Sequence, residues 1–187
     1  FMVGVGATFN ATASGFVNNT LIDDGILCGA FLTNSISYLN NVYLFNNTKS
    51  TTTAEAKVSA RTDILILNKG TMTITLSQIV QSSNLVFSTG TLTARDITVD
   101  TLMPSKNLRR LFKVTDGTLT AQRITVFARR RKGSKTDYWI TGVKATVTLD
   151  TISLNDAQVE KGYILDMVES TLSVTRFTTN NCAFAVE

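Results

Sequence analysis

An internal repeat is the sequence feature that most restricts the folds open to this chain. Three segments share one pattern of apolar positions, and they read GTLTARDITV at 90–99, GTLTAQRITV at 117–126 and ATVTLDTISL at 145–154. Apolar and polar residues alternate in each, except that two polar residues separate the second and third apolar positions. Alternation turns one side of a strand inward, and the two-residue step breaks it, as a bend between two short strands would.

Weaker copies of the pattern extend this repeat over the chain. Its third apolar position falls at Phe16, Val42, Ile79, Ile97, Ile124, Ile152 and Phe177. The intervals between these positions are 26, 37, 18, 27, 28 and 25 residues, which scatter around a period near 26. A further apolar patch opens each unit, as at 64–67 and 138–140. Each unit is therefore predicted to supply about three short strands joined by turns or loops.

A unit of three short strands cannot bury its own apolar face, but stacked units share one continuous core. The repeat therefore predicts an all-β fold, a parallel β-solenoid of about seven coils. The 30 threonines and the single proline agree with this, since threonine is β-branched and fits strands well. An antiparallel β-sandwich is the alternative, but it needs more hairpin turns than the two Asp-Gly pairs supply.

We expect a single β-helix segment over residues 1–187, with a long loop insertion near 48–62 and basic corner loops at 103–110 and 128–137. The chain begins and stops beside apolar stretches, so we interpret it as a segment of a longer rod. Unpaired strand edges at both ends of such a segment favour association. The expected partners there are further coils of the same chain or neighbouring subunits.

Asparagine pairs follow several strands that are expected to end a unit. They occur in Phe16-Val17-Asn18-Asn19 and Phe177-Thr178-Thr179-Asn180-Asn181, with Leu44-Phe45-Asn46-Asn47 as a looser copy. These units resemble coils of the right-handed parallel β-helix of the pectin-lyase-like class and the FxxN repeats of the polymorphic outer-membrane protein family. The companion GGA-[ILV] motif of that family has only a near match, Cys28-Gly29-Ala30-Phe31. The resemblance implies right-handed coils, and the asparagines are expected at turns, where stacked side chains could form a ladder.

The lack of histidine excludes a Ser-His-Asp triad, a Cys-His pair and histidine metal ligands. Cys28 and Cys182 are 154 positions apart, which places them near opposite ends of a rod and disfavours a disulfide between them. We expect buried thiols, or pairing with chain beyond this segment. The sequence indicates no cofactor and no metal.

Polysaccharide lyases and hydrolases that resemble this fold use clustered acidic residues, and glycoside hydrolysis generally needs two placed carboxylates. The acidic residues of this chain are scattered. Asp96, Arg123 and Asp150 occupy the two-residue step of three successive units, so they should be neighbours on an outer corner. We interpret them as surface ion pairs, with a catalytic cluster or a partner-binding site as the alternatives. No catalytic residue is predicted, and we expect the chain not to be an enzyme.

Eight basic residues are predicted to form one patch that binds a polyanion or a partner: Lys106, Arg109, Arg110, Arg129, Arg130, Arg131, Lys132 and Lys135. The first three follow a strand that ends near Val99, and the others follow a strand that ends near Val126, one unit later. Loops from one corner of successive coils should lie together, and their charges repel each other without a counter-charge. Acidic glycans and acidic proteins are the expected partners, whereas the shortage of interleaved aromatics disfavours nucleic acid. A solvated loop without a partner remains the alternative.

Three Asn-x-Thr sequons begin at Asn10, Asn18 and Asn46. In a secreted eukaryotic protein they would be N-glycosylation sites on exposed turns. No apolar run is long enough for a transmembrane helix, and the residues at the start of this segment are not expected to be a signal peptide, since they lack a basic region. We expect an extracellular or cell-surface location.

These observations together predict a non-enzymatic structural or adhesive β-helix of an extracellular, cell-surface or filament protein. It would act as a rigid scaffold that packs against neighbouring subunits or glycans. One alternative is a carbohydrate-active enzyme or a polysaccharide-binding module of the pectin-lyase-like class. Another is a segment of a viral or phage fibre.

Overall fold

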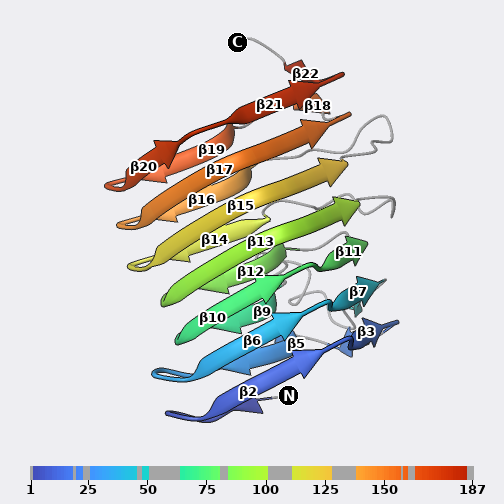
Figure 1. Ribbon diagram of the computed structural model, residues 1–187, viewed down its shortest axis with the longest axis vertical. Coiled ribbons are helices and arrows are strands. Elements are labelled where there is room, and N and C mark those ends of the chain that lie inside the picture. Colours follow the sequence, from blue (N-terminus) through green and yellow to red (C-terminus); the bar gives the residue numbers. More distant parts are fainter. Residues whose placement is uncertain are drawn as a thin grey trace.

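The computed structural model describes residues 2–18, 20–22, 26–45, 48–50, 64–80, 84–100, 111–127, 138–156, 158–159 and 163–184. Over these residues the chain is all-β, and every described strand pairing between coils is parallel. Inner strands pair with the coils before and after them, whereas strands of the first and last described coils pair on one side. The coils stack along the long axis of the molecule (Figure 1). The predicted parallel β-solenoid is confirmed.

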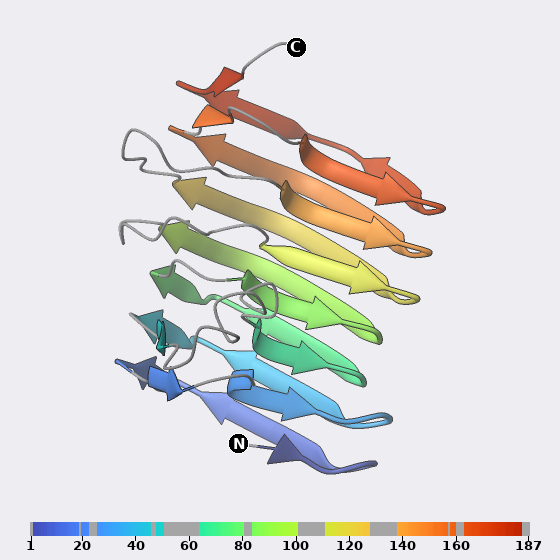
Figure 2. The ribbon, with the colours of Figure 1, turned by 180° about the vertical axis from the view of Figure 1, so that it is seen from behind.

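One long sheet, called sheet A here, takes one strand from each coil in chain order. Its seven strands are β1 (Met2–Val3), β5 (Ile26–Phe31), β9 (Ile64–Asn68), β12 (Asn84–Ser88), β14 (Phe112–Thr115), β16 (Tyr138–Val143) and β19 (Tyr163–Val168). Figure 2 shows these shorter strands in front of the second sheet.

The second sheet, called sheet B, contains the repeats that define the chain. Its eleven strands are β2 (Thr8–Thr12), β3 (Gly15–Val17), β6 (Ile36–Asn40), β7 (Tyr43–Phe45), β10 (Thr71–Thr75), β11 (Gln78–Val80), β13 (Thr91–Asp100), β15 (Thr118–Phe127), β17 (Thr146–Asn155), β20 (Thr171–Val174) and β21 (Phe177–Asn180). The three clearest repeats align residue for residue, from the row Thr91, Thr118 and Thr146 to the row Asp100, Phe127 and Asn155.

Two short pairs complete the described strands. They are β4 (Thr20–Ile22) with β8 (Thr48–Ser50), and β18 (Gln158–Val159) with β22 (Ala183–Phe184). The first residues of the predicted loop insertion near 48–62 therefore form a strand, and residues 51–63 lie outside the described residues. The predicted basic corner loops at 103–110 and 128–137 also lie outside them.

A column of left-handed residues produces the bend that the two-residue step predicts. Positive φ angles between 50° and 59° recur at Ala13, Asn41, Leu76, Asp96, Arg123 and Thr151. The bend separates β2 from β3, β6 from β7 and β10 from β11, but β13, β15 and β17 continue through it. The prediction of three separate short strands per unit is therefore wrong for the coils of β13, β15 and β17, where two of the strands merge into one strand of ten residues.

Inward-facing rows of sheet B form the centre of the core. Leu92, Leu119 and Val147 are in register and fully buried, as are Ala94, Ala121 and Leu149 two residues further along each strand. Burial of each leucine or valine side chain contributes about 1.5–3 kcal/mol. A continuous core of this kind needs neighbours on both sides of every coil.

A buried amide ties sheet A to sheet B at the turn between them. Asn68 is fully buried, and its Nδ2 donates to the Ser88 hydroxyl and to the Thr91 carbonyl, each at 3.0 Å. Its Oδ1 accepts from the Gly70 backbone N–H at 3.1 Å. A buried amide with its donors and acceptor paired avoids the desolvation penalty of an unsatisfied polar group.

Glycine is required at this turn because successive coils approach closely. A Cβ atom added to Gly90 would overlap the carbonyl oxygen of Gly70 in the preceding coil. Gly90→Ala should therefore lower the free energy of unfolding by about 1–3 kcal/mol, the usual range for an overpacked site. Urea denaturation measures this change. Gly4→Ala is the matched control, since nothing lies within 4 Å of the added atom, and equal losses in both variants would contradict the argument.

The bend column offers a second test at Leu76, whose φ is 50° and whose side chain is 59% exposed. A left-handed conformation costs an ordinary residue roughly 1–2 kcal/mol, whereas asparagine tolerates it. Leu76→Asn, which copies Asn41 of the preceding coil, should raise the free energy of unfolding by about 1 kcal/mol. Thermal denaturation compares it with Leu76→Ala, which also removes the leucine side chain but adds no amide to hydrogen-bond the local backbone, and should bring no such gain. A stabilisation of equal size in the alanine variant would count against a conformational cause.

Candidate functional site

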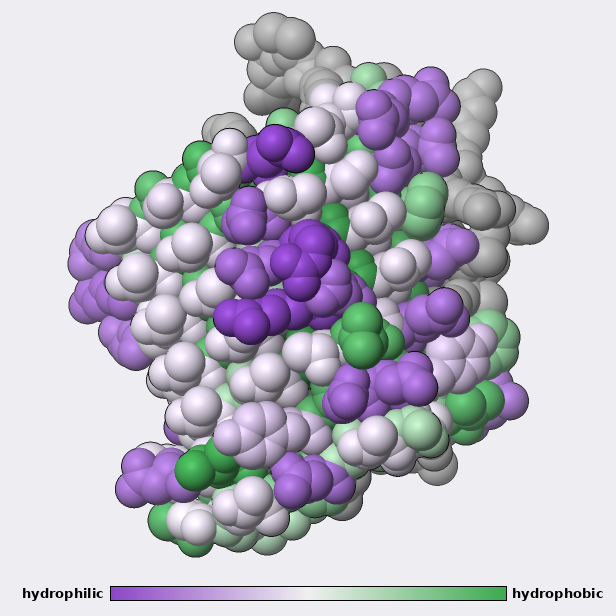
Figure 3. All heavy atoms as spheres, in the orientation of Figure 1, coloured by the Kyte–Doolittle hydropathy of each residue, from purple (hydrophilic) through white to green (hydrophobic). Residues whose placement is uncertain are grey.

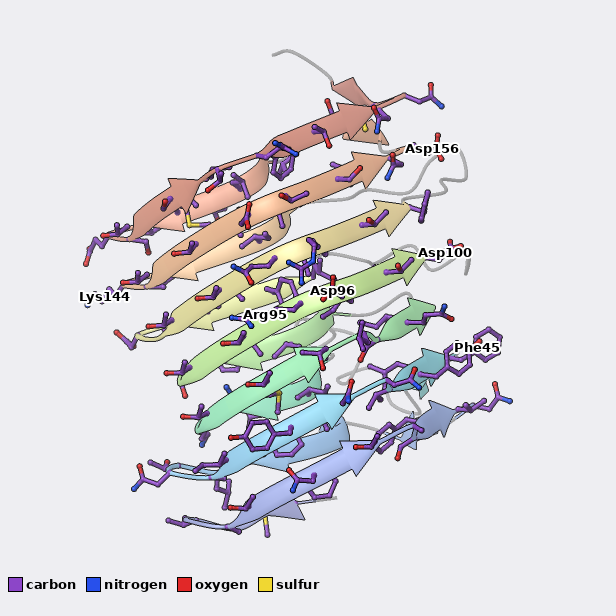
Figure 4. All side chains as sticks on the ribbon, viewed as in Figure 1. Phe45, Arg95, Asp96, Asp100, Lys144 and Asp156 are labelled. Atoms are coloured by element: carbon purple, nitrogen blue, oxygen red, sulfur yellow. The ribbon has the colours of Figure 1, made fainter. Side chains whose placement is uncertain are left out.

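Three successive coils bring their charged residues together on the outer face of sheet B. Arg95 pairs in register with Gln122, and Gln122 with Asp150, while the residue after each lies in the bend column. Figure 4 shows Arg95 and Asp96 in the middle of this face, away from Lys144 and Asp156 at its margins. The prediction that these positions are neighbours is confirmed.

Arg123 and Asp96 form a two-pronged ion pair across adjacent coils. The Arg123 Nε donates to Asp96 Oδ1 at 2.5 Å, and Nη2 donates to Oδ2 at 2.7 Å. This fork geometry is the strongest arrangement that arginine offers a carboxylate. The Arg123 side chain is 56% exposed and that of Asp96 is 33% exposed, so water screens the pair.

The ion pair sets the protonation of both partners. Hydrogen bonding from Arg123 lowers the pKa of Asp96. Hydrogen bonding to Asp96 raises the pKa of Arg123, and the negative charge of Asp150 raises it further. A general acid must hold a proton near neutral pH, and the lowered pKa of Asp96 leaves it ionised there. The geometry therefore supports the interpretation of these residues as a surface ion pair.

Figure 3 shows strongly hydrophilic side chains gathered in the middle of this face, over β13 and β15. We call Arg95, Asp96, Gln122, Arg123 and Asp150 the charged cluster. Among the residues that the structure describes, no group of three or more cysteine, aspartate or glutamate side chains is placed to hold a metal ion.

One of the three asparagine pairs, at 180–181, bonds to the preceding coil as a ladder would; Asn19, Asn46 and Asn47 lie outside the described residues, so the ladder stays a prediction there. Asn180 Nδ2 donates to Asn155 Oδ1 at 2.9 Å in the preceding coil. Asn155 Nδ2 in turn donates to the Val126 carbonyl at 3.1 Å, and Asn181 Nδ2 donates to Asp156 Oδ1 at 2.8 Å. These amides link neighbouring coils at the corner where sheet B ends.

The predicted basic patch stays a prediction, because all eight of its residues lie outside the described residues: Lys106, Arg109, Arg110, Arg129, Arg130, Arg131, Lys132 and Lys135. The strands that precede the two loops do end side by side, with Asp100 opposite Phe127. Two basic segments therefore follow neighbouring strand ends.

Two of the predicted glycosylation sites can be placed. Asn10 is exposed on β2, the edge strand of sheet B, and Asn18 lies after β3 with a φ of 54°. Asn46 lies outside the described residues, and modification of all three stays a prediction. Cys182 is a half-buried free thiol, and the side chain of Cys28 is outside the described part of the chain.

Two columns of small hydroxyl side chains on sheet B escaped the sequence reasoning. Column one contains Thr71, Thr91, Thr118, Thr146 and Thr171, and column two contains Thr73, Thr93, Thr120, Thr148 and Ser173. The signal was present as a Thr-x-Thr or Thr-x-Ser motif at the start of five successive units. The high threonine content indicated strands, but only the register shows that the side chains align.

No protein-family model, no curated protein and no solved structure gives a significant match to this chain. Within the described residues, no helix is long and apolar enough to cross a membrane.

The ion pair makes a prediction about pH. Arg123→Gln should raise the pKa of Asp96 toward its ordinary value, and NMR titration of the Asp96 carboxyl measures the change. Because the pKa is lowered in the folded state, the pair favours folding above about pH 4, and this contribution disappears as the pH falls through the lowered pKa. Arg95→Gln is the control, since it leaves the hydrogen-bonded pair intact and should change the pKa less. Identical titration in the wild type and Arg123→Gln would refute the assignment.

Proposed function

We propose that this chain is a non-enzymatic structural scaffold, a rigid β-solenoid whose last described coil is covered by another coil. That coil comes from a second copy of the chain or from further repeats of the same protein. The observation that carries the proposal is an exposed core row on the coil that contains β19, β20 and β21.

Leu172 and Val174 occupy core positions in this coil but remain 38% and 41% exposed. They are in register with Val147 and Leu149, which are fully buried in the preceding coil. Among the described strands β20 pairs with β17 alone, so no strand covers the other side of Leu172 and Val174. On β19, Leu165 and Met167 are only half-buried, although their register partners Ile140 and Gly142 in the preceding coil are buried.

A second coil with the same apolar spacing would supply the covering strand that this surface lacks. It would bury the exposed row and pair with the open N–H and C=O groups of β20 and β21, which otherwise invite association. The opposite end of sheet B presents the β2 edge, with half-buried Phe9 at the matching core position. Contacts between two different ends are heterologous, and they generate filaments when they do not close into a ring.

An extracellular or cell-surface location is part of the proposal. Its support is the place of two sequons, with Asn10 exposed on β2 and Asn18 at the turn after β3. An adhesive or spacer role fits a rod whose shape is set by backbone pairing along its whole length.

End-to-end association is tested with a double variant, Leu172→Lys with Val174→Lys. Small-angle X-ray scattering should show that wild-type particles lengthen as the protein concentration rises. The double variant should remain monomeric, because lysine at core positions prevents a second coil from packing there.

Thr171→Lys with Ser173→Lys is the matched control, since these residues lie on the same strand and face outward. It should still associate. Wild-type protein that stays monomeric at every concentration would contradict the proposal, as would equal loss of association in both double variants.

A further inference from the structure

We propose that the two columns of hydroxyl side chains on sheet B, together called the threonine face, bind the surface of ice. The face contains the ten residues named above, from Thr71 and Thr73 on β10 to Thr171 and Ser173 on β20. The inference concerns a surface that the scaffold role does not use, and it does not depend on that role.

The first argument is regularity. Five successive strands carry the columns without a shift in register, so each side chain has the same backbone surroundings as the next. Figure 1 shows β10, β13, β15 and β17 running in nearly the same direction, and Figure 3 shows pale rows of side chains over them. The hydroxyls therefore repeat on a lattice fixed by backbone pairing.

The spacing of that lattice is close to the spacing in ice. Adjacent parallel strands lie about 4.8 Å apart, and alternate residues on one strand lie about 6.6 Å apart. Hydrogen-bonded water oxygens are about 2.75 Å apart, so tetrahedral geometry puts second neighbours about 4.5 Å apart and the layer repeat near 7.3 Å. Over the four intervals of a column the mismatch accumulates to only about 1.2 Å, less than half of one water–water distance.

The second argument is chemical. Extended over β6 and β2, the two columns contain fourteen described positions, and none of them carries a charge. The four positions outside the threonine face are Thr8, Asn10, Ile36 and Tyr38. A charged group holds its own hydration shell, whereas threonine presents one hydroxyl and one methyl group of fixed orientation. An uncharged array can therefore order water without imposing a competing shell.

The third argument is that the hydroxyls are available. Thr71, Thr91 and Thr146 are exposed, and Thr93 and Thr120 are half-buried. Within the described chain the hydroxyl groups of the threonine face make no hydrogen bond to protein, unlike the Thr75 hydroxyl one row further along, which donates to Asn40. Strand spacing keeps neighbouring hydroxyls in a column too far apart to bond to each other.

The face also has limits that match the proposal. Toward β6 it ends at Ile36 and Tyr38, which interrupt both columns with bulky exposed side chains. Across the strands it ends at the charged cluster, where Arg95 and Asp150 occupy the next outward row. The uncharged lattice is thus a bounded patch, and the rest of the surface of sheet B differs from it.

Ice affinity is tested by freezing a dilute solution slowly around a cooled surface and measuring how much protein enters the ice. Wild-type protein should enter it well above the level of serum albumin. Thr120→Lys, at the centre of the face, should fall to the albumin level, because one lysine displaces water over several lattice positions. Thr120→Val, which keeps the shape and loses the hydroxyl, should give an intermediate fraction.

Thr125→Lys is the matched control. Thr125 lies on the same strand, is also half-buried, and faces outward beyond the bend, in register with Thr98 and Ser153. It should retain wild-type incorporation, and circular dichroism should show that all variants fold.

Three results would overturn the inference. The first is wild-type protein excluded from ice like albumin. The second is an equal loss in Thr120→Lys and Thr125→Lys, which would make the effect one of net charge. The third is retention on crystalline cellulose or chitin without incorporation into ice, which would assign the face to a polysaccharide surface.

Discussion

In-register parallel pairing between coils is the constraint on which the whole structure depends. Once β13, β15 and β17 pair residue for residue, every position in one coil inherits the backbone conformation of the coil below. The bend column shows the cost of this rule, since Leu76 and Arg123 adopt a left-handed conformation that suits neither residue. Glycine at 90 follows from the same rule, because the coils cannot separate locally to admit a side chain.

Much of the fold could be predicted because the constraint leaves a periodic record in the sequence. The two-residue step of GTLTARDITV marks the bend at Asp96, and repetition of that step places Arg123 beside it. Side-chain stacking at Asn180 could be predicted in the same way, from the asparagine pair that follows its strand, although its partner Asn155 is not part of such a pair. Each of these predictions concerns residues at equivalent positions of neighbouring coils.

The features that escaped prediction depend on more than the period. Whether two short strands merge depends on hydrogen bonding through the bend, and the same apolar pattern allows both the gap between β10 and β11 and the continuous β13. Exposure of Leu172 and Val174 could not be predicted either, since their spacing is that of fully buried residues. The threonine face was hidden because strand propensity already explained its threonines.

The outer face of sheet B is sorted by the backbone beneath it. In the straight part of each strand, an outward side chain has neighbours about 4.8 Å away on both sides, which favours short β-branched residues such as Thr93 and Thr120. At the bend two consecutive residues face outward, as Arg95 and Asp96 do, so long side chains have room to spread and to reach the next coil. The bend interrupts the alternation of inward and outward side chains. It therefore also divides the surface into an uncharged lattice and a charged cluster. Any ligand that spans the face would meet both chemistries, whereas a ligand that matches the lattice alone must stop at the bend.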